Sequence, residues 1–128
     1  MRLLLDTHAL VWIILEPEKL SQRATNLFFD RDYEIFLSIV SIWEIQIKVQ
    51  LGKLHFDLPL SELIESQQQV NDLQLLSITT EHIYALEKLP NHHRDPFDRL
   101  LIAQAMTEQM PLLSVDAVFD RYPIERWW

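Results

Sequence analysis

The sequence predicts an α/β fold, a three-layer sandwich in which helices flank a central, mainly parallel, twisted sheet. The main observation is that short apolar runs alternate along the chain with longer segments of helical periodicity. The first run, at residues 2–5, is apolar without alternation, as expected of a strand buried on both faces. With 128 residues, of which 48% are hydrophobic, residues 1–128 can form a single domain with a substantial core.

Strands and helices are then assigned in order from apolar runs and from capping residues. Five apolar runs are expected to be strands: 2–5, 34–38, 73–78, 112–115 and 124–127. Helices are expected between them, at 8–15, 21–29, 42–51, 59–70, 81–86 and from 96 onward, with a short turn at 117–119. The expected helix caps are Asp6 or Thr7, Ser21, Ser41, Thr80 and Asp95, and Gly52 follows the end of the third helix.

The helix that begins at Pro96 is predicted to be buried on more than one side. Proline suits the first helical position, and Asp95 stands where an N-cap belongs. One apolar face is formed by Phe97, Leu100, Leu101 and Ala105, and it is widened by Ile102, Ala103 and Met106. Asp98 is an acid in the first turn of this apolar helix. Taken alone, it is explained by the helix dipole and by its capping-box spacing from Asp95.

Composition excludes several classes of protein. The chain has one glycine, so neither a P-loop nor a dinucleotide-binding fingerprint can be written. It has no cysteine, which excludes disulfides and thiolate metal sites and fits a cytoplasmic protein. No apolar run is long enough for a membrane span. The net charge of −8 does not favour binding to nucleic acid, which is a polyanion. Such binding would require a local basic patch or metal ions.

Acidic residues far apart in the sequence are expected at one edge of the sheet. Asp6 and Asp116 follow predicted strands, and Asp98 lies at the start of a helix. In parallel sheets these positions share the edge at which ligands bind. Glu44 is a fourth candidate, although a capping box with Ser41 and an i, i+4 pair with Lys48 would explain it alone.

Such a cluster of carboxylates needs a cation. Two carboxylates about 4 Å apart repel each other by roughly 4 kcal/mol at an effective dielectric constant near 20. Oxygen ligands of this kind suit Mg²⁺ or Mn²⁺, which can activate water for hydrolysis of a phosphodiester.

Four stretches of the sequence resemble the motifs of PIN-domain ribonucleases, and more narrowly the toxins of VapBC-type toxin–antitoxin pairs. They are L-L-L-D-T-H-A-L, S-I-W-E-I-Q-I-K, H-R-D-P-F-D-R-L-L-I-A-Q-A and L-L-S-V-D-A-V-F. The resemblance implies a PIN-like fold and cleavage of RNA by Mg²⁺- or Mn²⁺-activated water. It implies a homodimer and a separately encoded antitoxin. Its catalytic, metal-binding acids fall on Asp6, Glu44, Asp98 and Asp116, and Ser114 takes a hydroxyl position that is common before the fourth acid.

Four further residues have open roles as contacts of the metal or the substrate. Thr7 could bind the metal or orient water, but capping explains it better. Asp95 is interpreted first as an N-cap and then as a support for the metal ligands. His93 and Arg99 belong to the most basic stretch of the chain; they could bind RNA phosphates, or Arg99 could only balance the nearby acids. Two alternatives remain for the whole protein, namely a PIN-domain nuclease of RNA processing and a non-catalytic interaction module.

Overall fold

The computed structural model describes residues 1–128 and contains one sheet of five strands in the order β3-β2-β1-β4-β5. Every neighbouring pair is parallel, so the sheet predicted to be mainly parallel is entirely so. The strands are β1 (Arg2–Leu5), β2 (Glu34–Ser38), β3 (Gln74–Leu76), β4 (Leu112–Leu113) and β5 (Arg126–Trp127). Strands β2 and β3 lie on one side of β1. After β3 the chain crosses to the other side of β1, where β4 and β5 lie.

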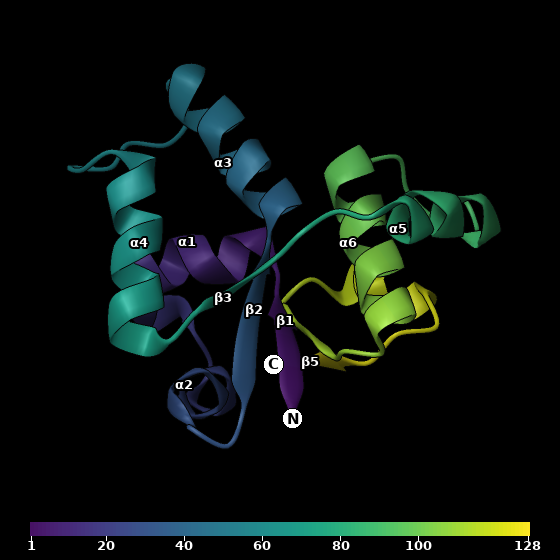
Figure 1. The fold of residues 1–128 in the computed structure, drawn as a ribbon, viewed down its shortest axis with the longest axis horizontal. Helices are drawn as coiled ribbons and strands as arrows, with labels where there is room; N and C mark the ends of the chain where they lie inside the picture. Colours follow the sequence, from purple (N-terminus) through teal and green to yellow (C-terminus); the bar gives the residue numbers. More distant parts are fainter.

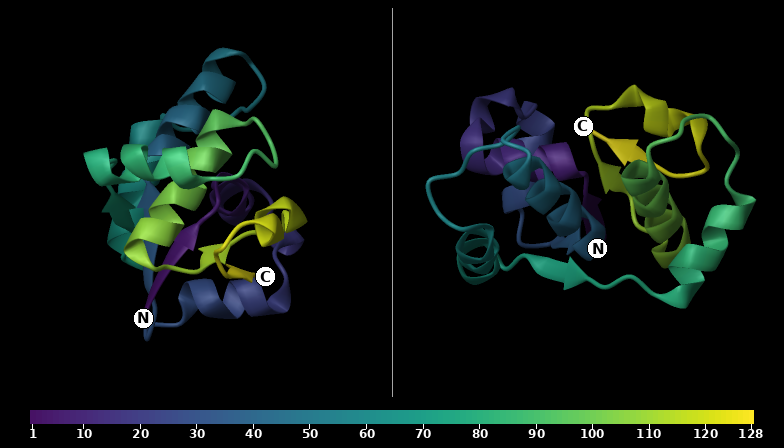
Figure 2. Two further views of the ribbon diagram at one scale, coloured as in Figure 1. Left: turned by 90° about the vertical axis from the view of Figure 1, so that its right-hand side faces the viewer. Right: turned by 90° about the horizontal axis from the view of Figure 1, so that it is seen from above.

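Helices cover both faces of the sheet, which gives the predicted three layers (Figures 1 and 2). The α-helices are α1 (Thr7–Leu15), α2 (Gln22–Phe29), α3 (Ile39–Gln50), α4 (Leu60–Asn71), α5 (Thr80–Ala85) and α6 (Pro96–Glu108). Three short 3₁₀ helices accompany them: η1 (Pro17–Lys19), η2 (Leu86–Lys88) and η3 (Ala117–Arg121). In Figure 1, α1, α2 and α4 lie on one side of the sheet, and α5 and α6 lie on the other.

Strand β1 separates two hydrophobic cores because its successive side chains point to opposite faces. Leu3 and Leu5 belong to the core under α1, α2 and α4, whereas Leu4 belongs to the core under α6. All three leucines are fully buried, which confirms the interpretation of residues 2–5 as a strand covered on both faces. The helix predicted from Pro96 is α6, and every residue from Leu100 to Ala105 is buried.

Two of the predicted helix caps, Ser41 and Thr80, are wrong, and α1 and α4 each begin one residue away from the predicted start. Helix α3 begins at Ile39, directly after β2, and its N-cap is Ser38, whose hydroxyl accepts a hydrogen bond from the N–H of Val40 (3.1 Å). Ser41 is therefore inside the helix, and the predicted capping box with Glu44 does not form. The strand and the helix share a boundary without a loop, so no turn signal marked it.

Helix α5 begins one residue earlier than predicted. Its N-cap is Thr79 rather than Thr80, and Thr79 forms a reciprocal capping box with the buried side chain of His82. A histidine at the third helical position is not the glutamate or glutamine of the usual pattern, which is why the spacing gave no signal.

The last three strands are shorter than their apolar runs. Strand β3 has three residues, and β4 and β5 have two each, against four to six predicted. Of the apolar residues beyond these strands, Leu73 is buried, whereas Ile78 and Val115 are exposed. No helix is both long and apolar enough to cross a membrane.

Candidate active site

The candidate site lies at the carboxyl ends of β1 and β4, where the strand order reverses from one side of β1 to the other. These strands are neighbours, and the chain leaves them on opposite sides, so they flank the switch point at which α/β sheets bind ligands. Asp6 follows β1 directly, and Asp116 lies three residues beyond the end of β4.

Asp6 and Asp116 are linked through the hydroxyl of Ser114. The buried Ser114 Oγ donates to Asp6 Oδ2 (2.8 Å) and accepts from the backbone N–H of Asp116 (3.0 Å). Asp6 occupies the N-cap position of α1, yet its carboxylate makes no capping hydrogen bond. Burial raises the pKa of Asp6, although the Ser114 hydrogen bond lowers it in part, and Glu44 adds to the rise. The carboxylate of Asp6 is therefore held in place without a neutralising partner.

Asp98 lies within electrostatic reach of all the other predicted ligands. Its side chain, 21% exposed, is in the first turn of α6. Burial first, and then the charges of Asp95, Asp6, Glu44 and Asp116, raise its pKa to about 7. Four acids from separate parts of the sequence therefore act on one carboxyl group.

Glu44 lies on α3 beside this site, and one of its carboxylate oxygens has no hydrogen-bond partner. Its side chain is 11% exposed, and Oε2 forms the predicted i, i+4 ion pair with Lys48 Nζ (3.1 Å). The other oxygen, Oε1, is buried and has no hydrogen-bond partner. A buried acceptor without a donor is rare in proteins, which suggests that this oxygen serves a ligand.

The role expected first for Asp95 is confirmed, because its Oδ1 accepts from the N–H groups of Phe97 (2.9 Å) and Asp98 (3.2 Å) as the N-cap of α6. The capping role expected for Thr7 is wrong. Thr7 is the first residue of α1 itself, and its buried hydroxyl donates to Ser41 Oγ (2.8 Å), which joins α1 to α3 beneath the site.

Arg99 stabilises the loop before α6. Its guanidinium donates to the backbone carbonyls of Pro90 (3.0 Å), His93 (3.4 Å) and Leu89 (3.5 Å), and it forms no salt bridge with any of the acids. These contacts were not expected from the sequence, since a loop conformation cannot be read from composition.

His93 lies beside Asp98, with 3.6 Å between its Nε2 and Asp98 Oδ2. Its Nδ1 is 2.7 Å from the hydroxyl of the buried Tyr122. No local pattern around Tyr122 predicts this contact, because the two residues are brought together only by the packing of η3 against the loop that precedes α6.

The carboxylates of the site are ligands of the kind that a hard divalent cation prefers. The donors are all carboxylate oxygens, and one of them, Glu44 Oε1, is buried without a partner. A positive ion would relieve the mutual repulsion that adds to burial in raising the pKa of Asp98. No group of three or more His, Asp or Glu side chains already stands in an arrangement that could hold an ion. Binding would therefore require these side chains to draw together.

Comparisons with known proteins agree with this fold. The family model of the PIN domain matches residues 3–125. None of the curated proteins compared with the chain matches it. A structure of VapBC2 from Rickettsia felis, bound to a DNA fragment from its promoter, is similar with a TM-score of 0.75 at 16% identity, covering 100% of both chains.

Two further structures are also similar in fold. FitAcB from Neisseria gonorrhoeae has a TM-score of 0.65 at 13% identity, covering 100% of this chain and 97% of the other. FitAB bound to an IR36 DNA fragment has a TM-score of 0.61 at 14% identity, covering 99% and 94%. Since the family model spans nearly the whole sequence, this chain belongs to the PIN domain family.

Proposed function

We propose that this protein is a Mg²⁺- or Mn²⁺-dependent endoribonuclease. Proteins with a PIN domain are generally nucleases and typically use divalent metals. The observation that carries the proposal is the convergence of distant acids: Asp6, Glu44 and Asp116 all lie close enough to Asp98 to act on its carboxyl group. Glu44 Oε1 is also buried without a hydrogen-bond partner. Burial first, and then these charges and that of Asp95, raise the pKa of Asp98 to about 7. Acids that only stabilised helices would not need to share one edge of the sheet.

Asp6, Glu44, Asp98 and Asp116 would hold the metal in this proposal. A bound Mg²⁺ or Mn²⁺ supplies Lewis acidity that lowers the pKa of water and stabilises the leaving oxygen of a phosphodiester. The other residues keep the carboxylates in position: Ser114 fixes Asp6 and the backbone of Asp116, and Lys48 holds one oxygen of Glu44. Burial of Asp6 and Glu44 keeps bulk water away from their carboxylates.

We further propose that the protein is the toxin of a type II toxin–antitoxin pair, with RNA as substrate and a separate antitoxin as partner. The motifs resemble VapBC toxins, and a VapBC2 structure shares the fold over its whole length. The expected homodimer and cytoplasmic location belong to the same proposal. Analytical ultracentrifugation of the chain, alone and with the product of a neighbouring small gene, tests both associations. A PIN nuclease of RNA processing would cleave RNA without binding such a product.

The non-catalytic alternative treats the acids as helix caps. Asp95 and Asp116 do cap α6 and η3, which favours it in part. Asp6, however, is buried and makes no capping hydrogen bond, and the Ser114 hydroxyl that donates to it carries no charge, so burying this carboxylate is costly. A structural role therefore leaves Asp6 unexplained.

Cleavage of RNA by single variants tests the proposal. Asp6→Asn and Asp98→Asn keep the shape of each side chain but remove a charged oxygen ligand, so cleavage of single-stranded RNA in Mg²⁺ or Mn²⁺ should fall by at least a hundredfold. Glu65→Gln, which removes an exposed acid of α4, is the matched control and should cleave as the wild type does. Normal cleavage by the Asp6 or Asp98 variant, or cleavage in excess EDTA, would contradict the assignment.

A further inference from the structure

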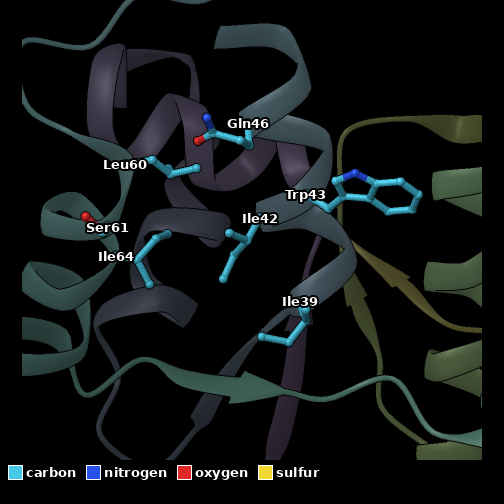
Figure 3. A pocket seen from close by; sticks show the side chains of 7 residues that line it. All are labelled: Ile39, Ile42, Trp43, Gln46, Leu60, Ser61 and Ile64. Carbon is cyan, nitrogen blue, oxygen red and sulfur yellow. The ribbon is translucent and has the colours of Figure 1, made fainter. Parts of the chain in front are cut away.

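An exposed tryptophan stands next to the acidic cluster. Trp43 precedes Glu44 on α3, and 58% of its surface is exposed, although tryptophan is one of the largest apolar side chains. It lines one end of an apolar groove of about 540 Å³ between α3 and α4. Figure 3 shows that its indole points away from the middle of this groove, where Ile64 and Leu60 lie.

The indole ring lies instead against α6. Its centroid is 5.1 Å from that of Phe97, with the two rings at 73° in an edge-to-face contact. Phe97 directly precedes Asp98 and packs against the core beneath α6. Trp43 therefore bridges the two helices that carry Glu44 and Asp98, and Phe97 restrains the ring while leaving much of it exposed to solvent.

Electrostatics gives this site little attraction for a polyanion. The chain has a net charge of −8, and the cations near the acids already have partners. Lys48 pairs with Glu44, and Arg99 donates to three carbonyl groups of the loop, which leaves Arg94 as the exposed arginine of that loop. Apart from the phosphate that the proposed metal ion would attract, contacts with the bases are then the main remaining source of affinity for a nucleic acid strand.

We propose that Trp43 is a stacking platform for one unpaired base of the substrate, next to the scissile phosphate. This rests on the proposed function, and it deepens it by assigning the binding of one base to Trp43. A base in a duplex has both faces covered by its neighbours, whereas an unpaired base can stack on an aromatic ring whatever its sequence. The restrained indole loses little conformational freedom when a base binds it.

The experiment combines protein variants with altered oligonucleotides. Trp43→Leu removes the aromatic face, Trp43→Phe keeps a smaller one, and Tyr84→Leu removes an aromatic side chain of α5 that is 69% exposed and serves as the control. Binding is measured by fluorescence anisotropy with a short 2′-O-methyl RNA, which resists cleavage. The same strand is also prepared with a single abasic site, moved one position at a time. Cleavage of unmodified single-stranded RNA is followed in parallel.

Trp43→Leu should weaken binding and raise KM by about 5- to 150-fold, with a smaller change in kcat. Trp43→Phe should lie between it and the wild type, and Tyr84→Leu should match the wild type. One abasic position should weaken wild-type binding but have no further effect in Trp43→Leu. A general loss of structure would instead weaken binding of every strand alike.

The proposal is overturned if Trp43→Leu binds and cleaves as the wild type does. It is overturned equally if every abasic position has the same effect in both proteins. An unchanged affinity for RNA together with altered sedimentation would assign Trp43 to an interface between protein chains. Failure of the nuclease function is distinguished from these outcomes, because the wild type itself would then fail to cleave RNA.

Discussion

At the scale of single residues, the pKa of Asp98 depends on both its position in the helix and its tertiary surroundings. Its backbone position is that of an ordinary first-turn acid, for which the helix dipole would favour ionisation. Burial and four neighbouring acids act in the opposite direction and raise its pKa to about 7. The helix dipole lowers the pKa of Asp98 and the tertiary surroundings raise it, so the direction of the measured pKa shift shows which effect is larger.

The first prediction concerns the pH dependence of stability without metal. The carboxyl group of Asp98 ionises near pH 7 in the folded protein and near its ordinary value of 3.8 when unfolded, so the folded state binds its proton more tightly. The free energy of unfolding should then fall as pH rises from about 4 to about 7, since proton binding favours the folded state in that range. Asp98→Asn should flatten this dependence and be more stable than the wild type above pH 7.

Urea unfolding in EDTA at several pH values measures this effect. The raised pKa of Asp6 acts in the same direction, so some dependence should remain in the variant. Glu65→Gln, with its exposed acid removed, should keep the wild-type profile. Identical profiles for wild type and Asp98→Asn would mean that Asp98 has no unusual proton affinity.

At the scale of elements, two features of the sequence determine the position of α6. Asp95 and Pro96 fix where it begins, and its broad apolar surface fixes how deeply it is buried. The same N-terminus brings Asp98 to the edge at which β1 and β4 end. Helix capping and the arrangement of the site are therefore coupled in one turn.

The second prediction separates the capping role of Asp95 from its charge. Asp95→Ala removes the acceptor of two N–H groups and should lower the free energy of unfolding by about 0.5–2 kcal/mol. Asp95→Asn can still accept these hydrogen bonds and should lose little stability. Both variants remove a negative charge that raises the pKa of Asp98, so this pKa should fall in both.

Chemical denaturation and NMR titration of the carboxyl carbons give the two readouts. If Asp95→Ala were as stable as the wild type, the cap would be unimportant for α6. If the pKa of Asp98 were unchanged in Asp95→Asn, the two carboxylates would not interact.

At the scale of the whole molecule, the sheet order decides which residues meet. Because β4 lies on the opposite side of β1 from β2, the carboxyl ends of β1 and β4 lie at the point where the strand order reverses. Acids from positions 6, 44, 98 and 116 reach it from four segments. Their repulsion is a cost to the whole fold that a cation could remove.

The third prediction follows from this cost. Millimolar Mg²⁺ or Mn²⁺ should raise the melting temperature of the wild type, since a ligand that binds only the folded state stabilises it. Asp6→Asn and Asp98→Asn should respond much less, whereas Glu65→Gln should respond fully. Differential scanning fluorimetry at constant ionic strength measures the shifts. Equal shifts in all four proteins would indicate screening by salt rather than a specific site.

Some features could be predicted from the sequence because they depend on local chemistry. The buried strand at residues 2–5, the start of α6 at Asp95 and the pair of Glu44 with Lys48 all follow from residues close together in the chain. The order of strands and helices follows from apolar periodicity, and the family from motifs spread along the whole sequence.

Other features were decided only by tertiary structure. The hydrogen bonds of Thr7 with Ser41 and of Arg99 with the loop carbonyls join groups whose separation depends on packing. So do the contact of Trp43 with Phe97 and the strong shift in the pKa of Asp98. The physical reason is the same in each case: periodicity and capping act over a few residues, whereas burial and charge act through space between segments that only the folded sheet brings together.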